Sequence, residues 1–208
     1  MNDRLLALVR IGFAVLVLAA ITTQILGLLG EGVFSPTRFF LYFTVLSNLF
    51  AVGVFLEGGR RQLAGLPPVP DLWRGAAVVF MAVTFIVFAV LLRGLQEELN
   101  TNIVWVDTVL HRIMPVAVMA DWLIEPPHGT LTFRRALVPW LVPPLAWTVL
   151  TLIRGAVDGW YPYPFLNPAN GGYGTVALYA VGILALFMAV VWVTATAGTA
   201  LRARRRDD

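Results

Sequence analysis

Residues 75–93 read GAAVVFMAVTFIVFAVLLR, an apolar run that carries no charge until it ends at Arg93. The hydrocarbon core of a bilayer is about 30 Å thick, and a helix of about 20 apolar residues crosses it. A helix also satisfies its backbone hydrogen bonds within its own segment, as lipid requires. The run lacks the alternation of polar and apolar residues that is typical of outer-membrane strands. It therefore predicts a transmembrane helix.

Similar runs lie on both sides of this stretch and predict an all-α, polytopic membrane protein. The composition agrees, because 59% of the residues are hydrophobic and only 13% are charged, against about 25% charged residues in soluble domains. The first run is longer than the apolar region of a secretory signal peptide, so we interpret it as a helix. We expect one domain, residues 1–208, that forms a single bundle of six transmembrane helices. The predicted helices span residues 5–29, 38–56, 75–93, 102–124, 133–153 and 173–196.

Basic residues predict the orientation of the bundle, because cytoplasmic loops carry an excess of them. If the N-terminus is cytoplasmic, the arginines of the outer loops are Arg38, Arg93 and Arg154. The arginines on the inner side are then Arg4, Arg10, Arg60, Arg61, Arg74, Arg134, Arg135, Arg202, Arg204, Arg205 and Arg206. We therefore expect both termini in the cytoplasm. The chain is rich in Arg, Ala and Val and contains no Lys, which suggests a bacterial cytoplasmic (inner) membrane.

The composition also excludes several kinds of chemistry. Without cysteine the chain has no disulfide and no thiolate nucleophile, and two histidines are too few for a classical metal cage. We therefore expect no metal and no other cofactor. The arginines lie mainly at the ends of the apolar segments, as topology signals do. Nucleic acid is therefore not an expected partner, whereas the lipid bilayer is, and the oligomeric state is not predicted.

Two of the predicted spans carry most of the polar side chains. Polar and ionisable groups within a membrane are costly, so they are candidates for function. The second span contains Tyr42, Thr44, Ser47 and Asn48, and the fourth contains Asp107, Thr108, His111, Arg112 and Asp121. Both spans run from outside to inside in the predicted topology, so the depths of their residues can be compared.

The depths predict that Thr44 and His111 lie close together. Thr44 follows the start of its span by six residues, or about 9 Å, and His111 follows the start of its own by nine, or about 13 Å. Residues four apart share a helix face, so Thr44 aligns with Asn48, and His111 with Asp107. Pro115 removes the hydrogen bond that the carbonyl of His111 would accept and favours a kink there. A nucleophile, a base and an orienting carboxylate are thus expected to converge.

Each of these residues also has an ordinary structural interpretation. Thr and Ser in membrane helices commonly bond a carbonyl one turn back or hold helices together. A histidine within a span can be a satisfied packing partner. We interpret Asp121 as structural, paired with Arg134 or Arg135 near the inner end of the bundle, and His128 as a solvated loop residue.

The connection between the last two spans has an unusual composition. Residues 159–168 read GWYPYPFLNP and contain three prolines and four aromatic residues. Proline stiffens the chain, and Trp and Tyr favour the membrane interface. The segment is therefore expected to be an interfacial anchor or a lid over the mouth of a cavity.

Three stretches carry a resemblance to a known family: residues 43–49 (FTVLSNL), residues 111–115 (HRIMP) and residues 163–166 (YPFL). Together they resemble the androgen-induced gene family of multi-pass membrane hydrolases, which cleave fatty acid esters of hydroxy fatty acids. The first resembles the family's helix with the threonine nucleophile, and the second the helix in which histidine precedes proline by four. The third resembles an aromatic-proline stretch before the last helix. The resemblance implies that Thr44 and His111 are the catalytic pair.

We therefore predict an intramembrane lipid ester hydrolase. Thr44 Oγ would attack the ester carbonyl while His111 takes its proton and later returns it to the leaving alcohol. Asp107 would stabilise the imidazolium that develops. The substrate would be a membrane lipid or fatty acyl ester.

Further residues are expected to support this reaction. Asn48, Ser47 or Tyr163 would supply hydrogen-bond donors to the oxyanion. The residues expected to contact the substrate chains are the aromatic side chains Phe39, Phe40, Trp105 and Phe165.

Two other functions fit the same residues. In a small-molecule or ion transporter, the polar faces of the second and fourth spans would line a pathway that Asp121 completes on the inner side. Transporters commonly have internal repeats, and we detect none in the sequence. In a non-catalytic membrane scaffold, the polar residues would only hold helices together. Alanine at Thr44 and His111 would then lower the melting temperature without affecting any activity.

Overall fold

The computed structural model describes residues 3–95 and 103–207, with side chains up to residue 203. Within these residues the chain is helical and forms no strand. The α-helices are α1 (Asp3–Gly30), α2 (Pro36–Phe39), α3 (Phe43–Leu63), α4 (Asp71–Val87), α5 (Val104–Thr108), α6 (Met114–Ile124), α7 (Phe133–Asp158) and α8 (Gly172–Asp207). Two π-helical turns, η1 (Phe88–Leu92) and η2 (Val109–Ile113), continue α4 and join α5 to α6. Two 3₁₀ turns, η3 (Pro164–Leu166) and η4 (Pro168–Asn170), lie between α7 and α8.

Four of these helical segments are long and apolar enough to cross a membrane. They are Asp3–Gly30, Asp71–Leu92, Phe133–Asp158 and Gly172–Ala203, and they match the first, third, fifth and sixth predicted spans. The prediction of an all-α membrane protein is thereby confirmed at this level. The second and fourth predicted spans correspond to α3 and to the α5–η2–α6 segment, which carry more polar and charged side chains.

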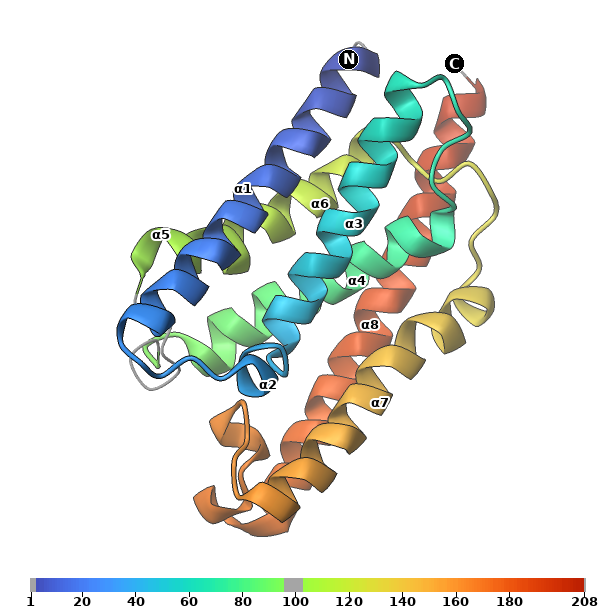
Figure 1. Cartoon of the computed structure of the whole chain (residues 1–208). Coiled ribbons are helices and arrows are strands. Elements are labelled where there is room, and N and C mark those ends of the chain that lie inside the picture. The colour runs from blue at the N-terminus through green and yellow to red at the C-terminus, as the bar shows by residue number, and fades with distance from the viewer. Residues whose placement is uncertain (1–2, 96–102, 208) are drawn as a thin grey trace.

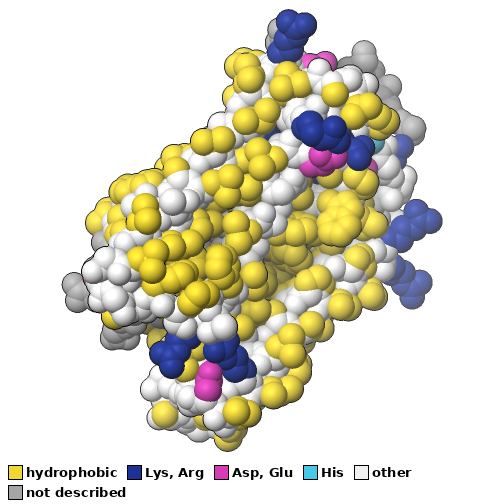
Figure 2. Space-filling model, in the orientation of Figure 1, with side chains coloured by type: hydrophobic (Ala, Val, Ile, Leu, Met, Phe, Trp, Pro, Cys, Tyr) yellow, Lys and Arg dark blue, Asp and Glu magenta, His cyan; other side chains and the backbone are white. Residues whose placement is uncertain are grey.

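The surface has the character of a lipid-facing one. Leu8 on α1, Leu150 on α7 and Leu178 on α8 are 59%, 63% and 73% exposed, and many other large apolar side chains are exposed with them. Figure 2 shows a broad apolar surface, with charged side chains gathered mostly towards its two ends. Soluble monomers rarely expose so large a contiguous apolar area, so this surface supports burial in a bilayer.

Helix α4 lies at the centre of the bundle and packs against α3, α6, α7 and α8. Two thirds (67%) of its apolar window is buried, a larger share than in the other three apolar helices. Small residues permit this close packing: a Cβ atom on Gly75 would overlap the ring of Trp140 on α7. The indole of Trp140 also donates a hydrogen bond of 2.8 Å to the carbonyl of Leu72. The sequence that predicted a span therefore forms the core of the bundle.

The boundaries of the second and fourth spans differ from the prediction. The predicted helix 38–56 is interrupted, because α2 ends at Phe39 and α3 begins only at Phe43, with Tyr42 as its N-cap residue. The start of the predicted helix 102–124 lies outside the described residues. Within this span the helix widens into the π-helical turn η2. Pro115 follows that turn and has no N–H to donate to the carbonyl of His111.

The two ends of the molecule are distinct. Figure 1 shows the N- and C-termini at one end, whereas α2 and the connection between α7 and α8 lie at the other. The start of α3 lies at this second end, beside α2. The polar side chains of α3 and η2 therefore meet near the end opposite the termini.

Candidate functional site

Thr44 and His111 are in contact, although they are 67 residues apart. His111 Nε2 lies 3.3 Å from Thr44 Oγ1, and the two residues are only 6% and 8% exposed. The proximity predicted from their depths is present. The counting behind it was wrong for Thr44, however, because α3 begins at Phe43 and Thr44 lies in its first turn.

Asp107 fixes the other ring nitrogen of His111. Nδ1 of His111 lies 3.0 Å from Asp107 Oδ1 and 3.2 Å from the main-chain oxygen of Asp107. Both oxygens are acceptors, so we assign the proton of a neutral imidazole to Nδ1. Nε2 then presents its lone pair to the hydroxyl of Thr44. The predicted alignment of Asp107 with His111 is thus present, and it orients the imidazole as a base towards Thr44.

The face of the imidazole is held by an aromatic ring. Phe88, the first residue of η1, stacks on His111 with a centroid separation of 4.0 Å and an interplanar angle of 13°. Asp107 and Phe88 together therefore fix the position and the plane of the ring. Nothing in the amino-acid pattern of residues 75–93 distinguishes Phe88 from its apolar neighbours, so this contact could not be predicted from the sequence.

Tyr163 brings a third polar group to Thr44. Its hydroxyl lies 3.4 Å from Thr44 Oγ1 and accepts a hydrogen bond of 3.3 Å from the N–H of Thr44. This N–H belongs to the first turn of α3, where backbone donors have no partner within the helix. Burial raises the pKa of Tyr163, against an opposing effect of its hydrogen bonds with Thr44. The phenol therefore stays protonated and can donate a hydrogen bond.

Ser47 and Asn48 have another role than the predicted one of oxyanion donors. Ser47 Oγ donates to the carbonyl of Thr44 at 3.1 Å. Asn48 Nδ2 donates to the same carbonyl at 2.9 Å and to the carbonyl of Leu110 at 3.1 Å, which uses both of its N–H groups. Because Leu110 precedes His111, the amide of Asn48 ties the start of α3 to the π-helical turn. These side chains position the pair and have no donor left for substrate.

Two cavities meet at Thr44 and Tyr163. A cavity of about 220 Å³ lies towards α1 and η2 and is the more polar of the two; we call it the polar cavity because Gln24, Asp107 and His111 line it, together with apolar side chains. An apolar cavity of about 210 Å³ lies between α4, α7 and α8. In Figure 2 the surface is hollowed between the α3–α4 region and α7, and the hollow is lined mainly by apolar side chains.

The predicted substrate-contacting residues divide between these spaces and the surface. Phe39 lines the polar cavity and Phe165 lines the apolar one. Phe40 and Trp105 line neither cavity and are each 43% exposed, so the prediction for these two is not supported. Phe40 follows the short helix α2, and Trp105 lies in the first turn of α5.

The proline-rich connection covers both cavities. Trp160 lines the polar cavity, Leu166 lines the apolar one, and Tyr163 lines both. The ring of Tyr163 packs against Tyr42, Trp147 and Phe165. The segment was predicted to be an interfacial anchor or a lid over a cavity, and these contacts fit the lid.

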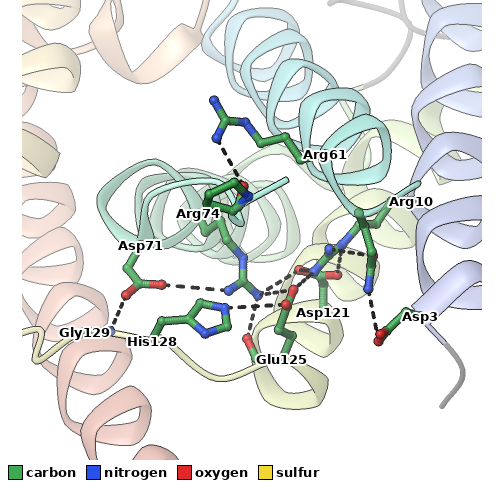
Figure 3. A network of polar contacts seen from close by, with 11 residues as sticks. Asp3, Arg10, Arg61, Asp71, Arg74, Asp121, Glu125, His128 and Gly129 are labelled. Carbon is green, nitrogen blue, oxygen red and sulfur yellow. Dashed lines mark hydrogen bonds and ion pairs between the residues drawn. The ribbon is translucent and has the colours of Figure 1, made fainter. Parts of the chain in front are cut away.

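A second group of buried charges lies far from this site, at the end of the bundle that holds the termini. Asp121 pairs with Arg10 of α1 through contacts of 2.6 and 3.0 Å and with Arg74 of α4 at 3.3 Å. Glu125 bonds both arginines as well. Figure 3 shows these four side chains converging from three helices. The predicted pairing of Asp121 with Arg134 or Arg135 is therefore wrong.

The rim of this group is more exposed. His128 lies 3.5 Å from Glu125 and its side chain is 47% exposed, so it is a solvated residue beside the ion pairs. Asp71 accepts a hydrogen bond of 2.7 Å from the N–H of Gly129, which holds the loop after α6 (Figure 3). Within the described residues, no three His, Asp or Glu side chains converge as metal ligands would. The arrangement holds α1, α4 and α6 together.

Comparisons of the chain with protein-family models, with curated proteins and with solved structures found no match. The functional interpretation therefore depends on the residues and distances described above.

Proposed function

We propose that this chain is an intramembrane lipid ester hydrolase in which Thr44 is the nucleophile and His111 the general base. One observation carries the proposal. A buried threonine hydroxyl lies 3.3 Å from Nε2 of an imidazole whose Nδ1 is hydrogen-bonded to the main-chain oxygen of Asp107 and lies 3.0 Å from the Asp107 carboxylate. This is the order of nucleophile, base and orienting group that hydrolases use. A hydroxyl that merely held helices together would not need the adjoining cavities.

The reaction proceeds in two halves. Thr44 Oγ attacks the ester carbonyl carbon as its proton moves to His111 Nε2, and Asp107 stabilises the imidazolium. His111 then gives the proton to the leaving alkoxide, which departs as the alcohol and leaves an acyl-threonine. A water molecule loses a proton to His111 and attacks the acyl carbonyl. Thr44 leaves with the proton from His111 and the fatty acid is released. Catalytic hydrogen bonds are often long in the absence of substrate, so the 3.3 Å separation is compatible with this proton transfer.

Tyr163 is the proposed oxyanion donor. Its hydroxyl lies beside Thr44 Oγ1 and the N–H of Thr44, close to where the carbonyl oxygen of a bound ester would be. The positive end of the α3 dipole adds to the stabilisation of negative charge there. Ser47 and Asn48 act indirectly, by positioning Thr44.

The proposed membrane arrangement has six spans. They are α1, α3, α4 with η1, the α5–η2–α6 segment, α7 and α8, with both termini in the cytoplasm of a bacterial cell. Two features support it. The termini lie at one end of the molecule (Figure 1), and most arginines are in segments that this topology places on the cytoplasmic side. The site then lies near the outer leaflet. The motif resemblance supports fatty acid esters of hydroxy fatty acids, or similar lipid esters, as substrates.

The direct test is release of free fatty acid from a branched fatty acid ester by detergent-purified protein. We expect activity in the wild type, partial activity in Thr44→Ser and none above background in Thr44→Ala. Thr151→Ala removes a fully buried threonine of α7 that lines neither cavity, and should keep wild-type activity. Mass spectrometry of quenched wild type should find the acyl group on Thr44. Full activity in folded Thr44→Ala would refute the nucleophile.

Tyr163→Phe tests the oxyanion donor. Loss of a single such donor typically costs about 10²- to 10³-fold in kcat, and we expect a decrease of that size. KM should change little, because the ring and its packing against Tyr42 and Trp147 are retained. Steady-state kinetics of the two proteins at matched folded concentration measure both quantities. An equal rise in KM with unchanged kcat would instead assign Tyr163 to ground-state binding.

A further inference from the structure

The two cavities that meet at Thr44 differ in chemistry. The polar one contains the carboxylate of Asp107, the imidazole of His111 and the amide of Gln24, with Arg38 among its lining residues. The apolar one is lined by aliphatic and aromatic side chains, apart from the hydroxyls of Thr44, Tyr163 and two further threonines. A lipid ester has the same division, since its hydrocarbon chain and its more polar half are joined at the reacting carbonyl.

We propose that the apolar cavity binds the acyl chain of the ester and that the polar cavity takes the alcohol half. This assignment rests on the proposed hydrolase function and deepens it. It specifies which of the two chains of a branched ester occupies which space, and therefore which cavity determines selectivity for acyl length.

The position of His111 requires this orientation. The imidazole must return its proton to the oxygen of the leaving alcohol, so that oxygen has to lie on the same side of the carbonyl as Nε2. His111 lines the polar cavity and does not line the apolar one. The third substituent of the carbonyl carbon, the acyl chain, then points away from His111. The space on that side of Thr44 is the apolar cavity.

The walls of the apolar cavity suit a flexible hydrocarbon chain. Val83 and Val87 of α4, Leu145 of α7 and Ile183 and Leu184 of α8 line it. Each methylene group buried against such walls contributes to binding through the hydrophobic effect and dispersion. The hollow opens on the apolar surface of the molecule (Figure 2), so a chain can enter sideways from the lipid without crossing a polar layer.

Two tryptophans hold α7 along the edge of this cavity. Trp147 Nε1 donates to the carbonyl of Leu41 at 2.8 Å, just before α3, and Trp140 Nε1 donates to the carbonyl of Leu72. The two indoles are seven residues apart and therefore share a face of α7. These two hydrogen bonds tie α7 to the segment before α3 and to the first turn of α4.

Ala180 on α8 offers a specific test, because it lines the apolar cavity and is half-buried. Ala180→Phe fills part of the space with a ring. Ala177→Phe adds the same ring to an exposed position of α8 that lines neither cavity, and is the matched control. Two ester series are needed: one with a fixed alcohol and acyl chains from acetyl to palmitoyl, and one with a fixed acetyl group and alcohols of increasing length.

We expect Ala180→Phe to lower kcat/KM for the palmitoyl ester by about 10- to 200-fold, the range that small changes in a hydrophobic pocket produce. For the acetyl ester the decrease should be much smaller, and across the alcohol series it should not depend on the length of the alcohol. Ala177→Phe should resemble wild type throughout. If Ala180→Phe instead discriminates against long alcohols, the two cavities have the opposite assignment and the proposal fails.

A second measurement does not depend on hydrolysis. Palmitate with a diazirine at its chain end is photolysed with each protein, and the labelled peptides are identified. The proposal expects label near Leu145 and Leu184, lost in Ala180→Phe and kept in Ala177→Phe. Label on α1 or α5, or label unaffected by Ala180→Phe, would overturn it. If the label behaves as expected but no ester is hydrolysed by the wild type, the acyl site stands and the proposed hydrolase function fails.

Discussion

Replacement of His111 by alanine should lower kcat for ester hydrolysis by about 10²- to 10⁴-fold, the usual contribution of a positioned acid–base group. The threonine hydroxyl is a poor nucleophile unless a base removes its proton. His111 Nε2 is the base in contact with Thr44 Oγ1. The variant loses both the base of the first step and the acid that protonates the leaving alkoxide. KM should change less than kcat, because the ring contributes little to binding of the chains.

The other histidine supplies the control. His128→Ala removes an exposed side chain at the opposite end of the bundle and should retain full activity. Removal of the His111 ring leaves a space between Phe88 and Asp107, so added imidazole should restore part of the rate in His111→Ala. A melting temperature lowered in His111→Ala with hydrolysis intact would contradict the catalytic role and favour the scaffold interpretation.

Replacement of Arg10 by alanine should destabilise the fold by about 3–5 kcal/mol, the usual result when one partner of a buried ion pair is removed. Arg10 is 5% exposed and bonds both Asp121 and Glu125. Without it, Arg74 is the remaining arginine within 4 Å of the buried Asp121 and the partly buried Glu125. The double variant Arg10→Met with Asp121→Leu should be less destabilised than the sum of the single variants, because both charges are removed together.

Thermal unfolding in detergent measures this effect. Arg60→Ala is the control, because the side chain of Arg60 is 59% exposed and its pair with Glu57 lies on the surface, where such pairs contribute at most about 1 kcal/mol. If Arg10→Ala and Arg60→Ala have the same melting temperature as wild type, the buried charges do not hold the helices together.

The same group of charges predicts a dependence on pH. Burial opposes the charge of Glu125, but hydrogen bonding to Arg10 and the positive charges of Arg74 and Arg10 outweigh it, so the pKa of Glu125 lies below its usual range. A lowered pKa in the folded state stabilises the fold at neutral pH, and this stabilisation is lost as the pH falls below about 4. The acid-induced fall in melting temperature should therefore be smaller in Arg10→Ala.

Much of the helical framework could be predicted from apolar runs, since residues 75–92 and 173–196 lie within long helical segments. The break at residues 40–42 could not, because Phe39, Phe40 and Leu41 are as apolar as the helix that follows. It depends on contacts from elsewhere, such as the hydrogen bond from Trp147 to Leu41.

Within the site, contacts between residues of one helix could be predicted, whereas contacts between helices could be predicted only in part. His111 and Asp107 are four residues apart, so their contact follows from helical geometry. The pairing of Thr44 with His111 could be predicted because both spans carry rare polar groups, although the depth counted for Thr44 assumed a helix that the structure interrupts. The carbonyl of Leu110 needs a donor only where the π-helical turn widens, so the role of Asn48 was not predictable. Several arginines could pair with Asp121, and their positions in the sequence do not show which of them lie near it in the fold.

The wide turn at Val109–Ile113 also determines how the two ends of its helix are aligned. A π-helical turn holds one residue more than an α-helical turn, and one residue corresponds to about 100° of rotation about the axis. Asp107 precedes the turn and faces His111, whereas Asp121 follows it and faces Arg10 and Arg74. Deletion of one residue from the turn would leave the hydropathy unchanged but rotate one carboxylate away from its partners. The number of residues in this segment therefore matters to the structure as much as the identity of His111 does.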